Sequence, residues 1–422
     1  MTALQILAGL LVVAAAASYI NHRLLRLPAT IGLMALTLLA SLAFVILDKL
    51  GVVDLTPAAA YVRAFDFGGL LLHGMLAFLL FAGALHVDLG ELKRQALPVA
   101  VLASIGVAIS SALAGAVFWL AARGLGFDLP VLHALLFGAL IAPTDPIAVI
   151  GILKRAGAPR SLETKIAGES LFNDGVGVVL FLMLLGIATE GTPPQASDIA
   201  LTLAREALGG IALGLVLGWL AYGLLRSIDA YKVEALLTLA VAAGGYGVAE
   251  ALHVSAPIAV VVAGLIVGNQ GRRNAMSERT RTQLDGFWEL LDEVMNALLF
   301  VLIGLQIIAI KLGWAEVAVG GLAIFAALAS RFTAIAVLIA AMRLTRRFSR
   351  GVVEILTWGG LRGGISIALA LSLPPLAHKD LILTATYTVV VFSILVQGLT
   401  IGQVIRARGQ QQHQPLPENR NV

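Results

Sequence analysis

Long apolar runs, each of about 17 to 25 residues and separated by short polar or charged segments, fill most of this 422-residue sequence. About 20 apolar residues are enough for a helix to cross the hydrocarbon core of a bilayer. Hydrophobic residues make up 59% of the chain and charged residues only 13%, whereas soluble domains are about one quarter charged. The sequence therefore predicts an all-α polytopic membrane protein with lipid as its surroundings.

We predict about thirteen transmembrane helices from these runs. Their expected ranges are 3–20, 28–47, 64–85, 96–122, 130–153, 162–188, 199–225, 233–252, 256–269, 293–310, 314–342, 351–373 and 381–405. The first run has no basic segment before it, and Arg23 and Arg26 follow it, so we expect a retained span and not a signal peptide.

The basic residues favour one orientation. The net charge is +4, but most of the 29 Lys and Arg residues fall in the loops that share one side of the predicted membrane. This bias predicts an outside N-terminus and a cytoplasmic C-terminus, and it argues against a nucleic-acid partner, which would need a basic face on a soluble domain. The chain has no cysteine, so disulfides and thiolate metal sites are excluded.

Two of the predicted helices carry helix-breaking residues. Pro143 and Pro146 interrupt the fifth helix, and the glycine-rich segment GGLRGG at 359–364 interrupts the twelfth. The two are seven spans apart and so cross the membrane in opposite directions, which is typical of an inverted-topology repeat. We expect a transmembrane domain over 1–405, with repeat one at about 3–188, a connector helix at about 199–225, repeat two at about 233–405, and a short cytoplasmic tail at 406–422.

The segment GESLFNDG at 168–175 places two carboxylates inside an otherwise apolar helix. A charged side chain at the bilayer centre costs roughly 2.5 to 3.5 kcal/mol on insertion scales, so the pair indicates a functional site. Because residues four apart share a helix face, Ser170 and Asp174 form one polar stripe, and Glu169 and Asn173 form another.

The first stripe suits an ion. We expect Asp174 and Ser170 to face Thr144 and Asp145 in the opened fifth helix, where carboxylate, hydroxyl and carbonyl oxygens would bind a hard monovalent cation. Other roles for these residues stay open: Asp145 could cap the half-helix after Pro146, and the hydroxyls of Ser170 and Thr144 could bond to their own helices.

The second stripe suits a structural cation. Arg331 is alone in the apolar run LAIFAALASRFTAIAVLI, and a buried arginine needs a partner. We expect it to pair with Glu169 near Asn173. Arg362, within the glycine-rich break, is the second candidate partner and could also offset the negative charge of the two broken helices.

Together these motifs resemble the monovalent cation:proton antiporter-1 family, which includes bacterial and archaeal sodium/proton antiporters and the animal sodium/proton exchangers. The resemblance rests on APTDP at 142–146, GESLFNDG at 168–175, SR at 330–331 and GGLRGG at 359–364, in that order. It covers nearly the whole chain.

This resemblance implies a secondary transporter of a bacterial-type inner (plasma) membrane, without enzyme activity or cofactor, that serves pH homeostasis. It implies that Na⁺ (or Li⁺) and H⁺ compete for Asp174, that Thr144, Asp145 and Ser170 add contacts, and that a homodimer moves the ion by alternating access. Asn173, where electrogenic relatives carry a second Asp, implies electroneutral one-for-one exchange. Ala82 departs from the family pattern, because many bacterial members carry an acidic residue there.

Other functions remain possible from the sequence. A K⁺/H⁺ antiporter of the same architecture is the main alternative. Two intramembrane aspartates could also belong to an aspartyl protease, although no GxGD motif lies near either one. A passive ion channel is the third alternative, and coupled proton counterflow would distinguish an antiporter from it.

Overall fold

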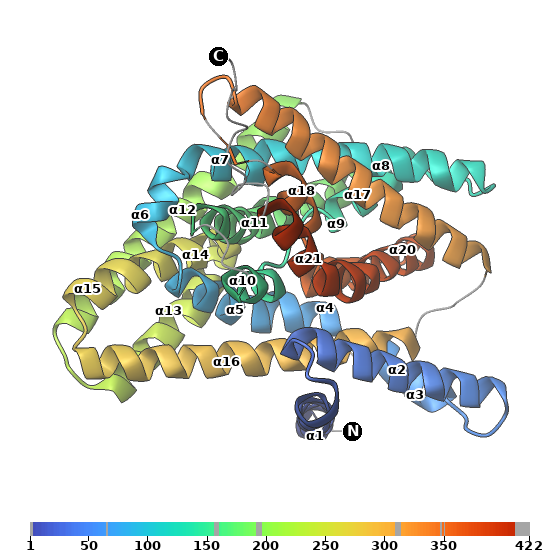
Figure 1. Cartoon of the computed structure of the whole chain (residues 1–422), viewed down its shortest axis with the longest axis horizontal. Coiled ribbons are helices and arrows are strands. Elements are labelled where there is room, and N and C mark those ends of the chain that lie inside the picture. The colour runs from blue at the N-terminus through green and yellow to red at the C-terminus, as the bar shows by residue number, and fades with distance from the viewer. Residues whose placement is uncertain are drawn as a thin grey trace, which may run out of the picture.

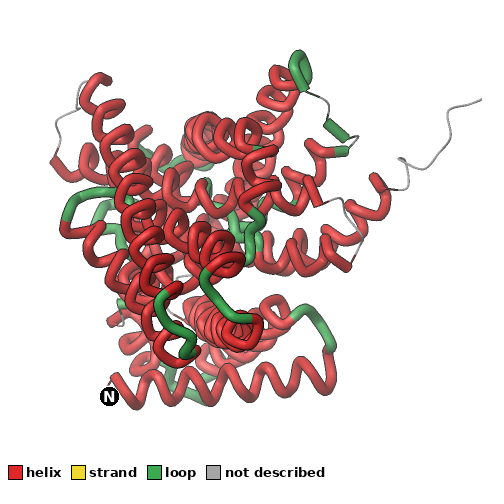
Figure 2. Tube along the Cα trace, turned by 90° about the vertical axis from the view of Figure 1, so that its left-hand side faces the viewer, coloured by secondary structure: helices red, strands yellow, loops and turns green. Residues whose placement is uncertain are grey.

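The structure, a computed structural model, describes residues 3–64, 66–155, 160–190, 196–308, 314–346, 348–349 and 351–409. These residues are almost entirely helical and contain no β-strand (Figure 2). Residues 410–422, most of the predicted tail, lie outside the described residues.

Among the described residues up to Glu190 there are eleven α-helices, whose arrangement Figure 1 shows. Their bounds are α1 Ala3–Ile20, α2 Ala29–Lys49, α3 Thr56–Ala64, α4 Phe67–Gly69, α5 Leu76–Leu85, α6 Leu89–Arg94, α7 Ala96–Val101, α8 Val107–Gly124, α9 Val131–Leu140, α10 Ile147–Arg155 and α11 Arg160–Glu190. The second half follows with α12 Ala196–Arg226, α13 Tyr231–Ala251, α14 Ala256–Ile266, α15 Arg272–Asn274, α16 Glu278–Leu305, α17 Trp314–Met342, α18 Val352–Trp358, α19 Gly364–Leu371, α20 Lys379–Phe392 and α21 Gly398–Gly409.

Short π-helical segments join several of these helices into longer rods, and one 3₁₀ turn at Gln306–Ile308 ends α16. The π-helical segments are Asn21–Leu25, Leu70–Met75, Leu102–Gly106, Val267–Gly271 and Ser393–Gln397. The joined helices span the lengths that the apolar runs predict, because a π-turn keeps the backbone hydrogen-bonded while it admits one extra residue.

Ten helices in the described residues are long and apolar enough to cross a membrane. They coincide with ten of the thirteen predicted spans. The other three predictions, 130–153, 256–269 and 351–373, fall on helices that are short or interrupted: α9 with α10, α14, and α18 with α19. The helical fold is therefore as predicted, while the count of thirteen spans and the inverted repeat stay predictions.

One predicted span is continuous with the amphipathic helix that residues 270–292 predict before it. The predicted span 293–310 is the second half of α16, which starts at Glu278. Its first half is amphipathic: Leu284 and Trp288 are buried, and the Trp288 indole donates a hydrogen bond to the hydroxyl of Thr238 in α13 (3.0 Å). Packing against α13 thus extends the helix beyond its apolar run.

The buried apolar side chains of the described residues form four clusters. Two of them surround the interrupted helices and unite α8, α9, α10 and α11 with α17, α18, α19, α20 and α21. The other two unite α5, α12, α13, α14 and the start of α16, and α1, α2 and the end of α16 with residues of α19 and α20. The interrupted helices consequently lie within packed protein, where open backbone is tolerated at membrane depth.

Candidate functional site

The two interrupted helices cross at their breaks. The backbone N–H of Asp145 donates to the carbonyl of Leu361 (2.7 Å), and these residues form an isolated antiparallel bridge. Asp145 lies between α9 and α10, and Leu361 lies between α18 and α19. The breaks predicted from prolines in one helix and glycines in the other therefore meet in one place.

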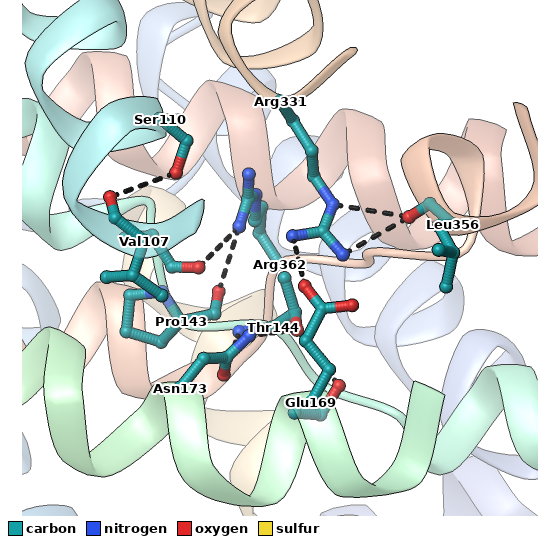
Figure 3. A network of polar contacts seen from close by, with 11 residues as sticks. Val107, Ser110, Pro143, Thr144, Glu169, Asn173, Arg331, Leu356 and Arg362 are labelled. Carbon is teal, nitrogen blue, oxygen red and sulfur yellow. Dashed lines mark hydrogen bonds and ion pairs between the residues drawn. The ribbon is translucent and has the colours of Figure 1, made fainter. Parts of the chain in front are cut away.

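Polar partners replace the backbone hydrogen bonds that the first break loses. An Nη1 atom of Arg362 donates to the carbonyls of Ala142 (2.7 Å) and Pro143 (3.3 Å), and the N–H of Thr144 donates to Oδ1 of Asn173 (3.2 Å) (Figure 3). Prolines 143 and 146 have no N–H to satisfy. Each freed group named here thus has a partner, as a buried backbone requires.

The second break is satisfied in the same way. Arg331 donates through Nε (3.3 Å) and Nη2 (3.2 Å) to the carbonyl of Leu356, near the end of α18. Gln397 donates to the carbonyl of Trp358 (3.1 Å), and the N–H of Arg362 donates to the hydroxyl of Ser393 (2.8 Å). The half-helices that lead into the two breaks, α9 and α18, thereby each end against an arginine. Its positive charge complements the partial negative charge of a helix C-terminus.

Asp145 provides the opposite charge at the helix N-termini. It lies two residues before the start of α10, with Pro146 between, and its side chain lies against Gly363, the residue before α19. A carboxylate there faces the partial positive charge of both half-helices. The crossing therefore holds a carboxylate at the two N-termini and guanidinium groups at the two C-termini.

Glu169 and Arg331 form a buried ion pair. Oε1 of Glu169 lies 2.9 Å from Nη1 of Arg331, and the two side chains are 3% and 9% exposed. Arg362, the second candidate partner, donates instead to the carbonyls of the first break. Figure 3 shows both guanidinium groups beside the helix that carries Glu169 and Asn173.

A chain of short polar contacts links α11 to the first break. The hydroxyls of Thr144 and Ser170 are 2.9 Å apart, and Nδ2 of Asn173 donates to Oγ1 of Thr144 (2.7 Å). Because its amide both donates to and accepts from Thr144, Asn173 holds the opened backbone against α11.

Asp174 lies one turn from Ser170 in the same helix. It is only 5% exposed, and its Oδ1 atom has no hydrogen-bond partner among the described residues. Its carboxylate is within electrostatic range of Asp145. The structure thus brings Asp174, Ser170, Thr144 and Asp145 together, with a buried oxygen that has no donor in the part of the chain that the structure describes. Oxygen atoms of this kind are ligands for hard cations.

Two contributors to the site were not found in the sequence. Ser393 and Gln397, which bond to the backbone of the second break, are buried. They stand four residues apart in the apolar run VVVFSILVQGL, so a shared helix face was a detectable signal. Ala82 lies in α5 and is buried in an apolar cluster with Phe81 and Leu85.

Gly360 makes room for the ion pair. A Cβ atom at this position would overlap the Arg331 guanidinium, so we expect Gly360→Ala to displace Arg331 from Glu169 and to lower stability by about 1 to 3 kcal/mol, the usual cost of overpacking. Thermal melting of the purified protein checks this. Gly223→Ala in α12 is the matched control, because nothing lies within 4 Å of its added methyl group; equal melting temperatures for the two variants would contradict the expectation.

A family model described as "Sodium/hydrogen exchanger, transmembrane" matches residues 10–407. The Na⁺/H⁺ antiporter NhaP of Pseudomonas aeruginosa is 48% identical over 408 residues, which covers 96% of each chain. The Na⁺/H⁺ antiporter NhaH of Halobacillus dabanensis is 38% identical over 342 residues, which covers 79% of this chain and 82% of NhaH.

The fold also has a solved counterpart. The sodium proton antiporter MjNhaP1 of Methanocaldococcus jannaschii aligns with a TM-score of 0.77 and 21% identity over 96% of this chain and 98% of MjNhaP1. At this identity the likeness concerns the arrangement of the helices.

Proposed function

The chain belongs to the sodium/hydrogen exchanger family, and on this premise we propose that it exchanges Na⁺ or Li⁺ for H⁺ across a membrane as a secondary transporter, not as an enzyme. Its substrates are the two ions, and it needs no cofactor. The observation that carries the proposal is Asp174, a buried carboxylate with an unsatisfied oxygen beside the hydroxyls of Ser170 and Thr144.

Burial explains why such a carboxylate binds ions. A buried negative charge without a partner is costly, and either a proton or a cation removes that cost. Because the Asp174 carboxylate holds either a proton or a sodium ion, it must release H⁺ before it can bind Na⁺ from the same side of the membrane. Proton release and sodium binding are therefore coupled. We propose that Asp145, Thr144 and Ser170 supply the remaining cation contacts, and that Glu169, Asn173, Arg331 and Arg362 hold the crossing in shape.

The charge of the site supports electroneutral exchange. If Asp174 carries either one Na⁺ or one H⁺, the loaded site has the same charge in both directions of transport. Moving one charge through 100 mV is worth about 2.3 kcal/mol, so one-for-one exchange responds to the concentration gradients and not to the membrane potential.

Asn173→Asp tests the stoichiometry. Oδ1 of the new carboxylate can still accept from the N–H of Thr144, and the Thr144 hydroxyl can turn to donate to it, so we expect a folded and active variant. With a further carboxylate next to Asp174 on α11, we expect exchange to become sensitive to an imposed potential. Na⁺-driven proton flux in proteoliposomes, with and without a K⁺/valinomycin potential, measures this; a variant that remains insensitive would contradict the charge argument.

Sodium is favoured over potassium by the relatives, whose names describe Na⁺/H⁺ antiporters. The decisive experiment is proton flux in everted vesicles on addition of Na⁺, Li⁺ and K⁺ in turn, across a range of pH. We expect responses to Na⁺ and Li⁺. A response to K⁺ alone would overturn the sodium assignment, and cation flux without proton counterflow would indicate a channel.

We further propose a homodimer in a bacterial-type inner membrane, with the N-terminus outside and the C-terminus cytoplasmic. Two apolar helices support a partner or lipid contact: α1 and α12 carry exposed Leu4, Val12, Leu201, Leu208 and Val216, each more than 60% exposed. The division into two inverted repeats, with α12 as the connector, belongs to this proposal, as does alternating access by a mobile part that contains the crossing.

A further inference from the structure

Two histidines from distant parts of the sequence meet beside the crossing helices. His133 lies in the first turn of α9, and His378 directly precedes α20. Their Nδ1 atoms are 3.3 Å apart, and the rings stand nearly edge to face, with centroids 5.5 Å apart and an interplanar angle of 65°. Both side chains are partly buried, and the proposed exchange reaction uses neither.

The spacing of the two nitrogens matches that of two ligands on one metal ion. Zn–N distances are about 2.0 to 2.1 Å, and a tetrahedral angle between two such bonds separates the nitrogens by about 3.3 to 3.4 Å. We propose that His133 and His378 form a two-imidazole site for a divalent transition metal ion such as Cu²⁺, Ni²⁺ or Zn²⁺, with water in the remaining positions. Imidazole nitrogen is a preferred ligand of these ions.

Metal binding here requires only small changes. In the direct Nδ1–Nδ1 hydrogen bond one ring donates and the other accepts, which neutral imidazoles can do. For the Nδ1 lone pairs of both rings to reach one ion, the ring that donates must first shift its proton from Nδ1 to Nε2. Each ring must then turn so that its lone pair makes an angle of about 35° with the line between the two Nδ1 atoms, because the N–metal–N angle is tetrahedral. Neutral rings therefore bind the ion without releasing a proton.

The ammonium group next to the pair in the sequence is held by backbone carbonyls. Lys379 follows His378 in the sequence, but its ammonium donates to the carbonyls of Leu371 (3.1 Å) and Leu373 at the end of α19. Among the described residues no cluster of three or more His, Asp or Glu side chains could hold a metal. With two protein ligands the site binds an exchangeable ion and is not a closed structural centre.

Occupancy would brace the crossing. α9 leads into the first break, α20 follows α19 and the second break, and the two helices contact each other. A metal ion between His133 and His378 joins them, and because it binds the folded arrangement it should raise the melting temperature.

The test uses full-length protein purified without a polyhistidine tag. Thermal melting is followed at increasing Zn²⁺, and Cu²⁺ binding is followed by electron paramagnetic resonance, which detects directly coordinated nitrogens. We expect a Zn²⁺-dependent rise in melting temperature and a Cu²⁺ signal from two nitrogens. His133→Gln and His378→Gln should each raise the half-saturating concentration by roughly ten-fold or more, since even an outer-shell change costs that much.

His73→Gln is the matched control, because His73 is an exposed histidine whose Nε2 atom lies 3.3 Å from Oε1 of Glu250; the variant should bind the metal as the unaltered protein does. If the unaltered protein shows no metal-dependent shift, or if either variant of the pair binds as tightly as the His73 control, the histidines form a structural contact only and the proposal is wrong. His378 lies in a turn before its helix, so its variant keeps the test decisive should His133→Gln fold poorly.

Discussion

Asp174→Asn should abolish exchange without loss of the fold. The amide has the size of the carboxylate, but it neither takes up a proton nor offers a negative charge to Na⁺. Since the carboxylate it replaces is 5% exposed and has an unsatisfied oxygen, removing the charge also removes a desolvation cost. We therefore expect a melting temperature equal to or above that of the unaltered protein, together with proton flux at the level of empty vesicles.

The control for this variant is Asp128→Asn, the same chemical change at an exposed position in the loop before α9. It should exchange Na⁺ for H⁺ at the normal rate. Exchange retained by Asp174→Asn would show that another group carries the ion, whereas an inactive variant with a sharply lowered melting temperature would show that Asp174 supports the fold.

Arg331→Met should produce the largest loss of stability. It leaves Glu169 charged, 3% exposed and without its partner at 2.9 Å, and it removes both donors from the carbonyl of Leu356. Breaking a buried pair from one side costs about 3 to 5 kcal/mol. The melting temperature in detergent should fall markedly, and the apparent Na⁺ affinity of the protein that remains folded should change little.

Two further variants make the prediction specific. The double variant Glu169→Gln/Arg331→Met has no orphan charge, so it should recover part of the lost stability. Arg408→Met breaks a comparable but exposed pair, with Glu354 at 3.1 Å and both side chains 40% exposed, and it should cost less than about 1 kcal/mol. A double variant as unstable as Arg331→Met would mean that the guanidinium acts through Leu356 and not through Glu169.

The sequence was most informative where local chemistry decides the structure. Prolines at 143 and 146 and glycines at 359–364 cannot continue a helix easily, and the structure interrupts both helices there. The composition of GESLFNDG marked a polar segment in an apolar helix. In contrast, the sequence offers two arginines, Arg331 and Arg362, as partners for Glu169 and does not choose between them. The packing of the helices decides: Arg331 forms the ion pair with Glu169, and Arg362 donates to the carbonyls of Ala142 and Pro143.

What the sequence did not predict depends on contacts between distant segments. The bridge from Asp145 to Leu361 joins residues more than 200 positions apart through backbone atoms, which carry no residue-specific signal. The sequence predicts an amphipathic helix around Trp288 but not that it runs without a break into the apolar span. Packing against α13, where Thr238 receives the Trp288 hydrogen bond, supports the single long helix α16. The pairing of His133 with His378 is likewise a product of the fold.

The central claim, that one carboxylate holds either a sodium ion or a proton, is tested most directly by counting protons released on Na⁺ binding. Titration of the purified protein with Na⁺ in two buffers of different ionisation enthalpy gives this number, with Asp174→Asn as the reference. We predict about one proton released per Na⁺ bound, an apparent Na⁺ affinity that weakens as the pH falls, and neither effect in Asp174→Asn. Na⁺ binding without proton release, or the same release from Asp174→Asn, would contradict the account.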